Sequence, residues 1–224
     1  MSPNRSFSRR VGKGLSKSQK NLLGDTLAQY LWNNNSLDDH LVDRSIILEI
    51  GFGMGEHFIH QACYRPDQLL IGVEAYLNGI ANVLKLALDA NIRNILLWPD
   101  DLDLMIKDIP LGCLSGIYLL FPDPWPKRKH HKKRFLNTER LHILQNKLKP
   151  GGFFIFASDV DDYFFATKDL VVKNNSFKPL ELDSDFLNQP NNYIVTKYHN
   201  KAQIEGRTTR FLHAIKRPLS QTDS

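Results

Sequence analysis

The chain contains 224 residues, of which 42% are hydrophobic and 24% are charged, a composition that suits one folded domain with a large apolar core. Its two cysteines, Cys63 and Cys113, exclude a disulfide framework and a CxxC metal site. The sequence shows neither the apolar segment of a signal peptide nor an apolar run of membrane length, so we expect a cytoplasmic protein.

The formal net charge of +5 is concentrated in a few segments. Residues 1–24 contain six Lys or Arg and no acid, and residues 127–134 contain six more without an acid. Removing those twelve from the 29 basic residues leaves 17 against 24 acidic residues, so the rest of the chain is acidic. A third basic group lies near the C-terminus, at Lys197, Lys201, Arg207, Arg210, Lys216 and Arg217. Localised positive charge of this kind predicts a polyanionic partner.

The predicted elements begin after a basic arm. Residues 1–15 are polar and are expected to be flexible, and a helix is expected from Ser16 or Ser18 to Trp32, followed by a loop at 33–39. Short apolar runs then predict strands at residues 46–50, 69–74, 95–98, 117–121 and 153–157. Amphipathic segments between and after them predict helices at 56–64, 78–90, 102–107, 134–148 and 161–173.

The alternation of strands and helices predicts an α/β fold with a parallel sheet and helices on both of its faces. The less regular final part is expected to add two antiparallel edge strands from the runs at 177–182, 193–198 and 209–215. We therefore expect a single domain over residues 16–217, with a C-terminal tail at 218–224.

The fourth predicted strand runs into the proline-rich corner Pro122-Asp123-Pro124-Trp125-Pro126 and then into the basic run 127–134. Proline ends regular structure, so one acid is placed at the mouth of a strand, beside an aromatic ring and a polycation. This arrangement suits a site for a polyanion, although each part alone is also compatible with an ordinary loop, a solvated face or a helix cap. Trp125 could stack on a base or pack under the loop. His130 and His131, without a third candidate metal ligand beside them, are expected to face phosphates.

A second candidate site follows the first predicted strand. Gly51, Gly53 and Gly55 let the backbone turn tightly and let a ligand approach the main chain. The dinucleotide-binding fingerprint requires a further glycine where this chain has Glu56, and a carboxylate there would repel a pyrophosphate. The loop therefore favours a ligand without phosphate.

Acidic residues near the ends of the first three predicted strands support this interpretation. Glu74 lies 23 residues after Gly51, where an acid commonly accepts the hydroxyls of a ribose, and Asp101 could read an adenine edge. Glu49 lies within an apolar strand, where a charged carboxylate is costly unless it meets a cation. A phosphate-free adenosine with a cationic tail describes S-adenosyl-L-methionine. Glu74 or Asp101 alone could equally be a helix cap.

Together these residues resemble the bacterial tRNA (guanine-N7-)-methyltransferase family over residues 9–216. The resemblance is carried by the stretch 48–55, Gly72-Val73-Glu74, the corner 121–125 with Lys127, Ser158-Asp159 and Thr196-Lys197-Tyr198. The resemblance implies the Rossmann-like α/β fold of class I methyltransferases, with a seven-stranded, mostly parallel sheet. It also implies methyl transfer from S-adenosyl-L-methionine to N7 of a guanosine in the tRNA variable loop (position 46), by a monomer or homodimer without a metal.

The resemblance also implies roles for individual residues. The cofactor would be bound by Glu49, Gly51, Gly53, Gly55, Glu74, Asp101 and Asp123. Asp123 would also be the catalytic acid. The substrate would be bound by Lys127, Asp159, Thr196, Lys197, Tyr198 and His199. The family usually has an acid where this chain has His199, so either His199 makes a different contact or Glu205 reaches the substrate instead.

Other function classes stay open on the sequence alone. An amino-group methyltransferase usually carries Asp-Pro-Pro-aromatic at such a strand end, whereas a single proline separates Asp123 from Trp125 here. A nicotinamide-dependent oxidoreductase is disfavoured by Glu56. A methyltransferase of another RNA atom remains compatible with the motifs, and a non-catalytic RNA-binding protein would explain the basic segments but not the strand-end acids.

Overall fold

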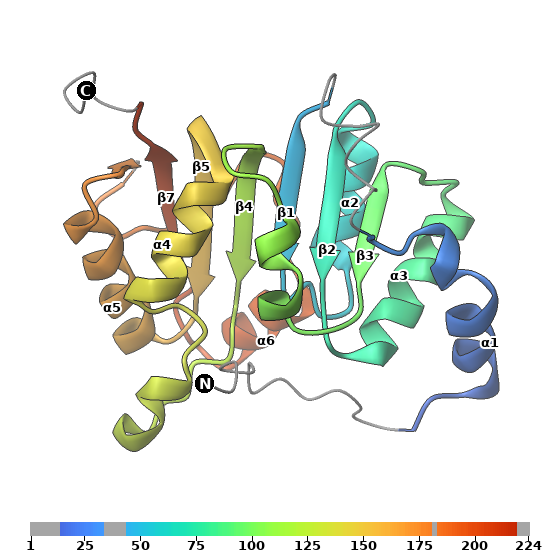
Figure 1. The fold of residues 1–224 in the computed structure, drawn as a ribbon. Helices are drawn as coiled ribbons and strands as arrows, with labels where there is room; N and C mark the ends of the chain where they lie inside the picture. The colour runs from blue at the N-terminus through green and yellow to red at the C-terminus, as the bar shows by residue number, and fades with distance from the viewer. Residues whose placement is uncertain (1–13, 34–43, 181–182, 219–224) are drawn as a thin grey trace. The chain divides into compact units, whose positions relative to one another are not determined.

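The computed structural model describes residues 14–33, 44–180 and 183–218 (Figure 1). It divides into two compact units, each treated by itself below. Unit 1 holds the described residues up to Ile109 together with Asn192–Ile194, and unit 2 holds the others. Almost all of the predicted basic arm, loop 33–39 and C-terminal tail lies outside the described residues. Within the described ranges, no helix is long and apolar enough to cross a membrane.

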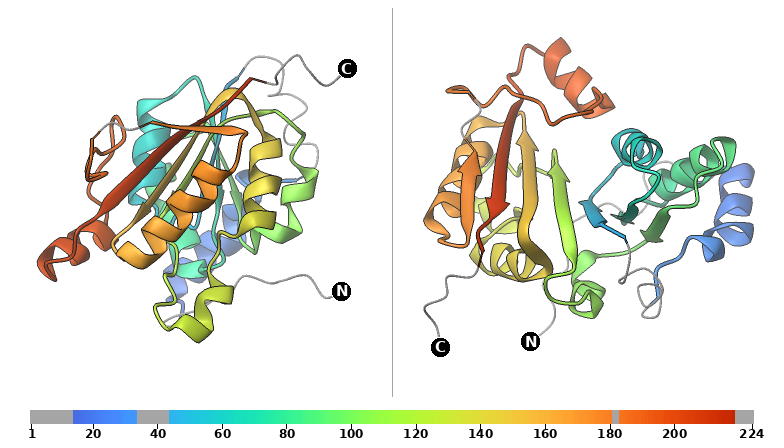
Figure 2. Two further views of the ribbon diagram at one scale, coloured as in Figure 1. Left: turned by 90° about the vertical axis from the view of Figure 1, so that its left-hand side faces the viewer. Right: turned by 90° about the horizontal axis from the view of Figure 1, so that it is seen from above.

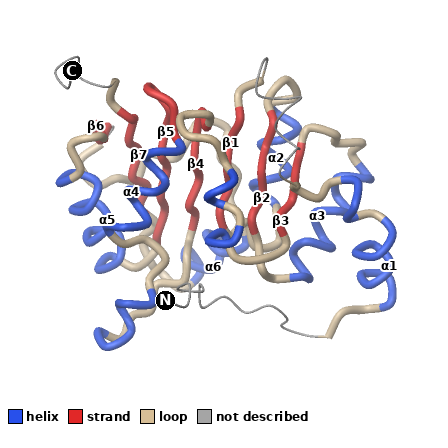
Figure 3. The backbone as a smooth tube through the Cα atoms, viewed as in Figure 1, coloured by secondary structure: helices blue, strands red, loops and turns tan. Residues whose placement is uncertain are grey.

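Unit 1 contains three parallel strands in the order β3-β2-β1: β1 (Ile46–Ile50), β2 (Leu69–Val73) and β3 (Ile95–Trp98). Every residue of β1 and β2 is buried, as expected for near-continuous apolar strands covered on both faces. The helices α2 (Glu56–Tyr64) and α3 (Leu77–Asp89) connect them (Figure 3). These elements confirm the predicted alternation, with the ends displaced by at most one residue.

The first helix is shorter than predicted. α1 (Lys17–Asp25) starts with a capping box between Ser16 and Gln19 and packs on α3 (Figure 2). Instead of continuing to Trp32, the chain makes a 3₁₀ turn, and the Trp32 N–H donates to the Leu97 carbonyl of β3 at 2.9 Å. Gly24 and Asp25 are weak helix formers, and Trp32 gains burial at 2% exposure beside the strand, so tertiary packing overrides the helical spacing.

Between β3 and unit 2, the predicted helix at 102–107 is replaced by two 3₁₀ turns, η2 (Leu102–Leu104) and η3 (Ile106–Asp108). Buried apolar residues anchor this segment: each turn has one, and Met105, between the two turns, is another. The helical segment is thus predicted at the correct position, but it has the hydrogen bonds of short 3₁₀ turns instead of those of an α-helix.

Unit 2 contains four strands in the order β4-β5-β7-β6: β4 (Leu114–Leu120), β5 (Leu148–Ser158), β6 (Phe177–Leu180) and β7 (Arg210–Lys216). β4 and β5 are parallel, and β7 runs antiparallel to both β5 and β6. β7 therefore lies inside this order rather than at its edge. The two predicted antiparallel strands are β6 and β7, from the runs at 177–182 and 209–215. The third run, 193–198, supplies no strand, because Thr196 caps the helix α6 (Lys197–Ile204).

The remaining helices of unit 2 are α4 (Thr138–Lys147) and α5 (Asp161–Lys173). α4 begins four residues later than predicted because the Asn137 side chain caps it, accepting from the Arg140 N–H at 2.9 Å. The basic run before it forms a 3₁₀ turn of its own, η4 (Arg128–Lys133). α5 is confirmed with the predicted bounds and contacts β5, β6 and β7.

Candidate cofactor and substrate sites

The glycine loop of unit 1 joins β1 to α2 in a conformation that needs glycine. Gly51, Gly53 and Gly55 have φ values of 71°, 58° and 81°, in the left-handed region that side chains disfavour. A Cβ atom on Gly55 would lie 2.1 Å from the Cγ2 atom of Val83 in α3, whereas one on Gly51 would meet nothing within 4 Å. The loop is therefore packed against α3 at its end and open at its start, where a ligand can approach the backbone.

Two further glycines, which belong to none of the predicted sites, support the loop. A Cβ on Gly79, in the first turn of α3, would lie 1.9 Å from the Gly53 carbonyl oxygen. A Cβ on Gly72 in β2 would lie 2.8 Å from the rings of Phe52 and Phe58. A glycine inside an otherwise apolar helix costs about 1 kcal/mol relative to alanine, and this cost is the signal that could have identified Gly79.

Glu74 follows β2 and fixes the backbone of the loop. One carboxylate oxygen accepts the Gly53 N–H at 2.8 Å, and the other accepts the Tyr76 N–H at 2.9 Å. An ionised carboxylate has room for about four hydrogen bonds, so these two bonds alone do not fill it. Glu74 thus contributes to the loop as well as offering acceptors at its side.

Glu49 is buried in β1, at 3% exposure, and finds its partner inside the protein. The Nδ1 atom of His57 in α2 lies 2.8 Å from its carboxylate. His57 is itself buried and its ring lies 5.6 Å from that of Tyr193, in the segment Asn192–Ile194 of the same unit. The sequence analysis did not predict this pair, because His57 belongs to no recognisable motif.

Asp101 caps a turn. Its carboxylate accepts the Asp103 N–H at 3.0 Å, and its backbone carbonyl accepts the indole N–H of Trp98 at 2.9 Å. The sequence left a capping role open for Asp101, and the structure shows one of its carboxylate oxygens in that role. Asp101 is buried at 7% exposure, close after the end of β3.

The proline corner of unit 2 begins where β4 ends. The Phe121 N–H still donates to the Ala157 carbonyl of β5 at 2.9 Å, and the chain then turns with positive φ at Phe121 (52°) and Trp125 (42°). Asp123 lies between these two residues. The residue as a whole is exposed, yet partial desolvation by the surrounding chain raises the pKa of its carboxyl above the ordinary value.

Trp125 packs into the basic turn that follows it. Its ring is perpendicular to that of His130 at a centroid distance of 5.8 Å, and the Lys133 Nζ atom lies 4.7 Å from the Trp125 centroid. His131 contacts Asp162, at 3.4 Å, and Arg134. Both histidines thus have partners within unit 2, and their contact with phosphates stays a prediction. The exposed cations of the run are Lys127, Arg128, Lys129 and Lys132.

Asp159, just after β5, is joined to a residue far along the chain. The Arg207 guanidinium donates to Asp159 through Nη1 and to Glu205 through Nη2, the latter at 2.6 Å. Arg207 therefore brings the two acids into one cluster of unit 2. Sequence reasoning missed this role, because 48 positions separate Arg207 from Asp159 and no local pattern links them.

The residues 196–199 are divided between the surface and the interior of unit 2. The Thr196 hydroxyl accepts the His199 N–H at 3.3 Å and so caps α6, while Lys197 and Tyr198 are exposed. His199 is 3% exposed and lies between the rings of Phe121 and Phe211, each at 5.9 Å. Desolvation lowers the pKa of His199, although the nearby Asp159 charge opposes this shift, so the ring is neutral at neutral pH.

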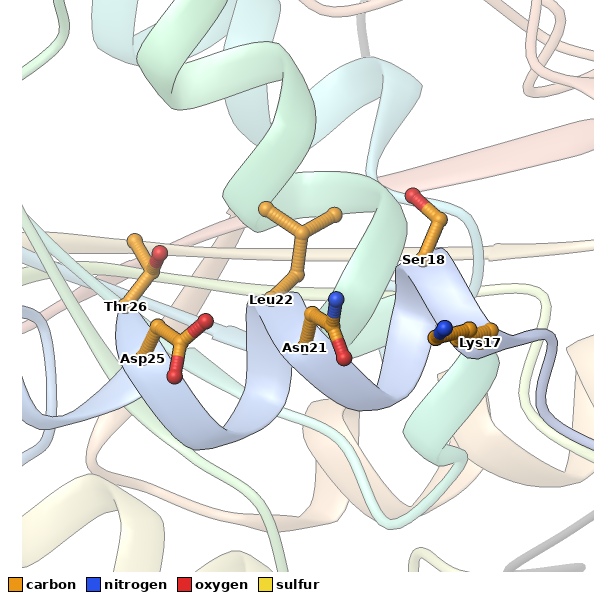
Figure 4. Close-up of a pocket in the computed structure, with 6 residues that line it drawn as sticks. All are labelled: Lys17, Ser18, Asn21, Leu22, Asp25 and Thr26. Carbon is orange, nitrogen blue, oxygen red and sulfur yellow. The ribbon is translucent and has the colours of Figure 1, made fainter.

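Unit 1 has a hollow beside α1 (Figure 4). It is lined by Lys17, Ser18, Asn21, Leu22, Asp25 and Thr26. None of the predicted cofactor or substrate residues lines it. Among the described residues, no group of three or more His, Cys, Asp or Glu is arranged to hold a metal ion.

Comparison with known proteins places the chain among methyltransferases. Residues 43–212 match a family described as "Putative methyltransferase". A "Bifunctional methyltransferase" from Rickettsia typhi is 54% identical over 215 residues, covering 95% of this chain and 41% of the relative. The chain thus spans about two fifths of the length of that relative. A "tRNA (guanine-N(7)-)-methyltransferase" from Jannaschia sp. is 36% identical over 229 residues and is matched over 97% of both chains.

The fold is also shared with a solved structure. The 16S rRNA (adenine(1408)-N(1))-methyltransferase from Catenulisporales acidiphilia, solved with cosubstrate SAM, has a TM-score of 0.53 and 13% sequence identity. The match covers 86% of this chain and 94% of that structure. It confirms the predicted Rossmann-like α/β fold, with its seven strands.

Proposed function

This chain belongs to the tRNA (guanine-N(7)-)-methyltransferase family, and we therefore propose that it transfers a methyl group from S-adenosyl-L-methionine to N7 of a guanosine in tRNA. The observation that carries the proposal is the match to the Jannaschia relative of that name, which extends over nearly all of both chains. We place the target in the variable loop, at position 46, and the protein in the cytoplasm as a monomer or homodimer.

The residues of unit 1 fit S-adenosyl-L-methionine, which would supply the methyl group as a sulfonium. The open side of Gly51 leaves space against the backbone, and both oxygens of Glu74 can accept the ribose hydroxyls. Glu49 offers a buried carboxylate for a cationic group, with His57 fixing its orientation. Glu56 at the start of α2 disfavours phosphate-bearing cofactors in the same place.

The chemistry requires charge stabilisation more than a base. Guanine N7 has an in-plane lone pair and no proton, so it can act as the nucleophile directly, and the methylated ring is a cation. In this proposal Asp123 is the catalytic residue, and Gly53, Gly55 and Asp101 belong to the cofactor residues of unit 1. The Asp123 carboxylate would accept from the guanine N–H groups and offset the developing positive charge. The desolvation that raises its pKa also strengthens its interaction with a cation.

Binding of the tRNA is assigned to unit 2. The exposed cations of the basic run, beginning with Lys127, would contact phosphates, and Lys197 and Tyr198 lie exposed at the start of α6. Asp159 would hold the guanine edge with Thr196 and His199. A variable-loop guanosine is part of the folded tRNA core, so it must be extruded at a cost of a few kcal/mol.

The test is methyl transfer from labelled S-adenosyl-L-methionine to an unmodified tRNA transcript, followed by borohydride and aniline treatment, which cleaves at N7-methylguanosine. We expect label incorporation and cleavage at one variable-loop guanosine. A transcript with that guanosine changed to adenosine is the matched control and should show neither signal. Incorporation of the label without cleavage would show that another RNA atom is methylated. The absence of any methyl transfer would contradict the proposal.

A further inference from the structure

We infer that Arg134 is a positioning residue for the proposed reaction, because it holds the backbone of the corner that carries Asp123. The inference rests on the proposed function. The sequence places Arg134 among six cations suited to bind phosphates. In the structure its side chain is only 7% exposed, unlike those of its neighbours in the run, so it is directed into unit 2 and away from a polyanion.

The guanidinium of Arg134 makes several contacts at once. Its Nε atom donates to the Pro124 carbonyl at 3.0 Å, and its Nη2 atom donates to the Asp162 carboxylate and lies 3.2 Å from Nε2 of His131. Its Cζ atom lies 4.7 Å from the centroid of the Tyr163 ring. Only the planar, forked guanidinium can satisfy such a set together, since an ammonium group is a single point charge.

The contact with the Pro124 carbonyl controls the shape of the corner. That carbonyl belongs to the peptide plane between Pro124 and Trp125, so its direction sets the backbone angles on either side. Trp125 has a φ of 42°, a conformation that is unfavourable for a non-glycine residue and persists only where the surroundings enforce it. By holding the peptide plane that follows Pro124, Arg134 restricts the backbone of the corner that carries Asp123.

The other end of the guanidinium is bound to the helix α5. Asp162 lies in the first turn of α5, and its hydrogen bond with Arg134 lowers the pKa of the Asp162 carboxyl. The neighbouring Tyr163 is buried, and its hydroxyl accepts the Leu136 N–H at 3.2 Å, just beyond the basic turn. Arg134 therefore anchors the corner to α5, while the exposed lysines of η4 remain available for phosphates.

The test is Arg134→Lys, which keeps the charge and removes the fork. We expect kcat for tRNA methylation to fall by about a hundredfold, because small misplacements of a catalytic group have effects of that size. KM for tRNA should stay near the wild-type value. Arg140→Lys is the matched control: Arg140 also donates to a backbone carbonyl, that of Phe135 at 2.8 Å, and lies 4.5 Å from its ring, but Phe135 is outside the corner 122–126. It should leave both constants unchanged.

Thermal unfolding of each variant is measured alongside the kinetics. If Arg134→Lys is too unstable to assay, Asp162→Asn removes one anchor and keeps the Arg134–Pro124 contact, and it should lower kcat by a smaller factor. Wild-type kcat in both variants would overturn the inference. A raised KM for tRNA with unchanged kcat would also overturn it, and would indicate that Arg134 contacts a phosphate. A wild-type protein without any methyl transfer would instead contradict the proposed function, and the two failures are thus told apart.

Discussion

Three acidic side chains of the proposed site meet three different kinds of partner. Glu74 accepts two backbone N–H groups, Glu49 faces a buried imidazole, and Asp159 meets a guanidinium. At Asp123, desolvation raises the pKa of the carboxyl. At the level of single residues, these carboxylates therefore lie in different surroundings, and substitution of each should have its own signature.

Glu74→Gln should weaken binding of S-adenosyl-L-methionine by about tenfold or more, because hydrogen bonds to a charged acceptor contribute about 1.5–3 kcal/mol and the neutral amide is a poorer acceptor for Gly53 and Tyr76. Isothermal titration calorimetry measures the change directly. Glu139→Gln, at an exposed acid in the first turn of α4, removes the same charge and should bind the cofactor as the wild type does. Equal affinity in both variants would contradict the assignment of Glu74.

Asp123 should give the reaction an acid limb in its pH profile. Only the ionised carboxylate can offset a developing cation, and the pKa is raised, so activity should fall as the pH drops through a value above the ordinary Asp pKa of about 3.9. Single-turnover rates between pH 4 and pH 8 test this. Asp123→Asn should abolish most activity and remove that limb, while tRNA binding persists. A wild-type rate in that variant would exclude a catalytic role for Asp123.

At the scale of elements, the contact between α3 and the glycine loop depends on the absence of one side chain. Gly79→Ala would place a Cβ 1.9 Å from the Gly53 carbonyl oxygen, so α3 and the loop would have to separate. We expect a decrease of about 1–3 kcal/mol in the free energy of unfolding, as for overpacked interiors, together with weaker cofactor binding. Urea unfolding and calorimetry measure the two effects.

The matched control for that substitution is Gly24→Ala in α1. A Cβ at Gly24 meets nothing within 4 Å, and alanine is a better helix former, so stability should stay the same or rise by up to about 1 kcal/mol. Equal destabilisation of both variants would show that backbone flexibility, and not the close approach of α3 to the loop, explains the requirement at Gly79.

The elements also show what could be predicted from the sequence. The strand at 46–50 and the helices at 56–64 and 161–173 are confirmed at the predicted bounds, because their apolar spacing and their tertiary burial agree. The run at 193–198 has strand-forming residues, but the Thr196 hydroxyl caps a helix there, a local hydrogen bond that outweighs propensity. Trp32 likewise leaves the predicted helix for a buried place beside β3.

The positions of the candidate acids were predictable where they follow apolar strands, since Glu74, Asp101 and Asp123 lie just after strand ends in the structure as expected. The supporting residues could not be predicted in the same way. His57 and Arg207 find their partners across elements, and the identity of such a partner depends on packing rather than on spacing in the sequence.

At the scale of the whole molecule, the uneven distribution of charge predicts a salt-dependent affinity for tRNA. Replacing Lys129 and Lys132 by Gln should reduce the slope of log K against log salt concentration by about one for each phosphate that the protein no longer neutralises. Filter binding at several salt concentrations measures the slope. Lys178→Gln, in exposed surface on β6, changes the net charge without altering η4 and should leave the slope unchanged. An unaltered slope in the double variant would exclude η4 from phosphate binding.

The path of the chain through the two units has a consequence for dissecting the protein. The chain leaves unit 1 after Ile109 and returns to it at Asn192–Ile194, where Gln61 donates to the Asn192 carbonyl at 2.9 Å and Tyr193 packs beside His57. A fragment ending at residue 109 would lack these contacts, so a single proteolytic cut or a stop codon there does not release a complete unit. Unit 1 is therefore built from two separate stretches of the sequence.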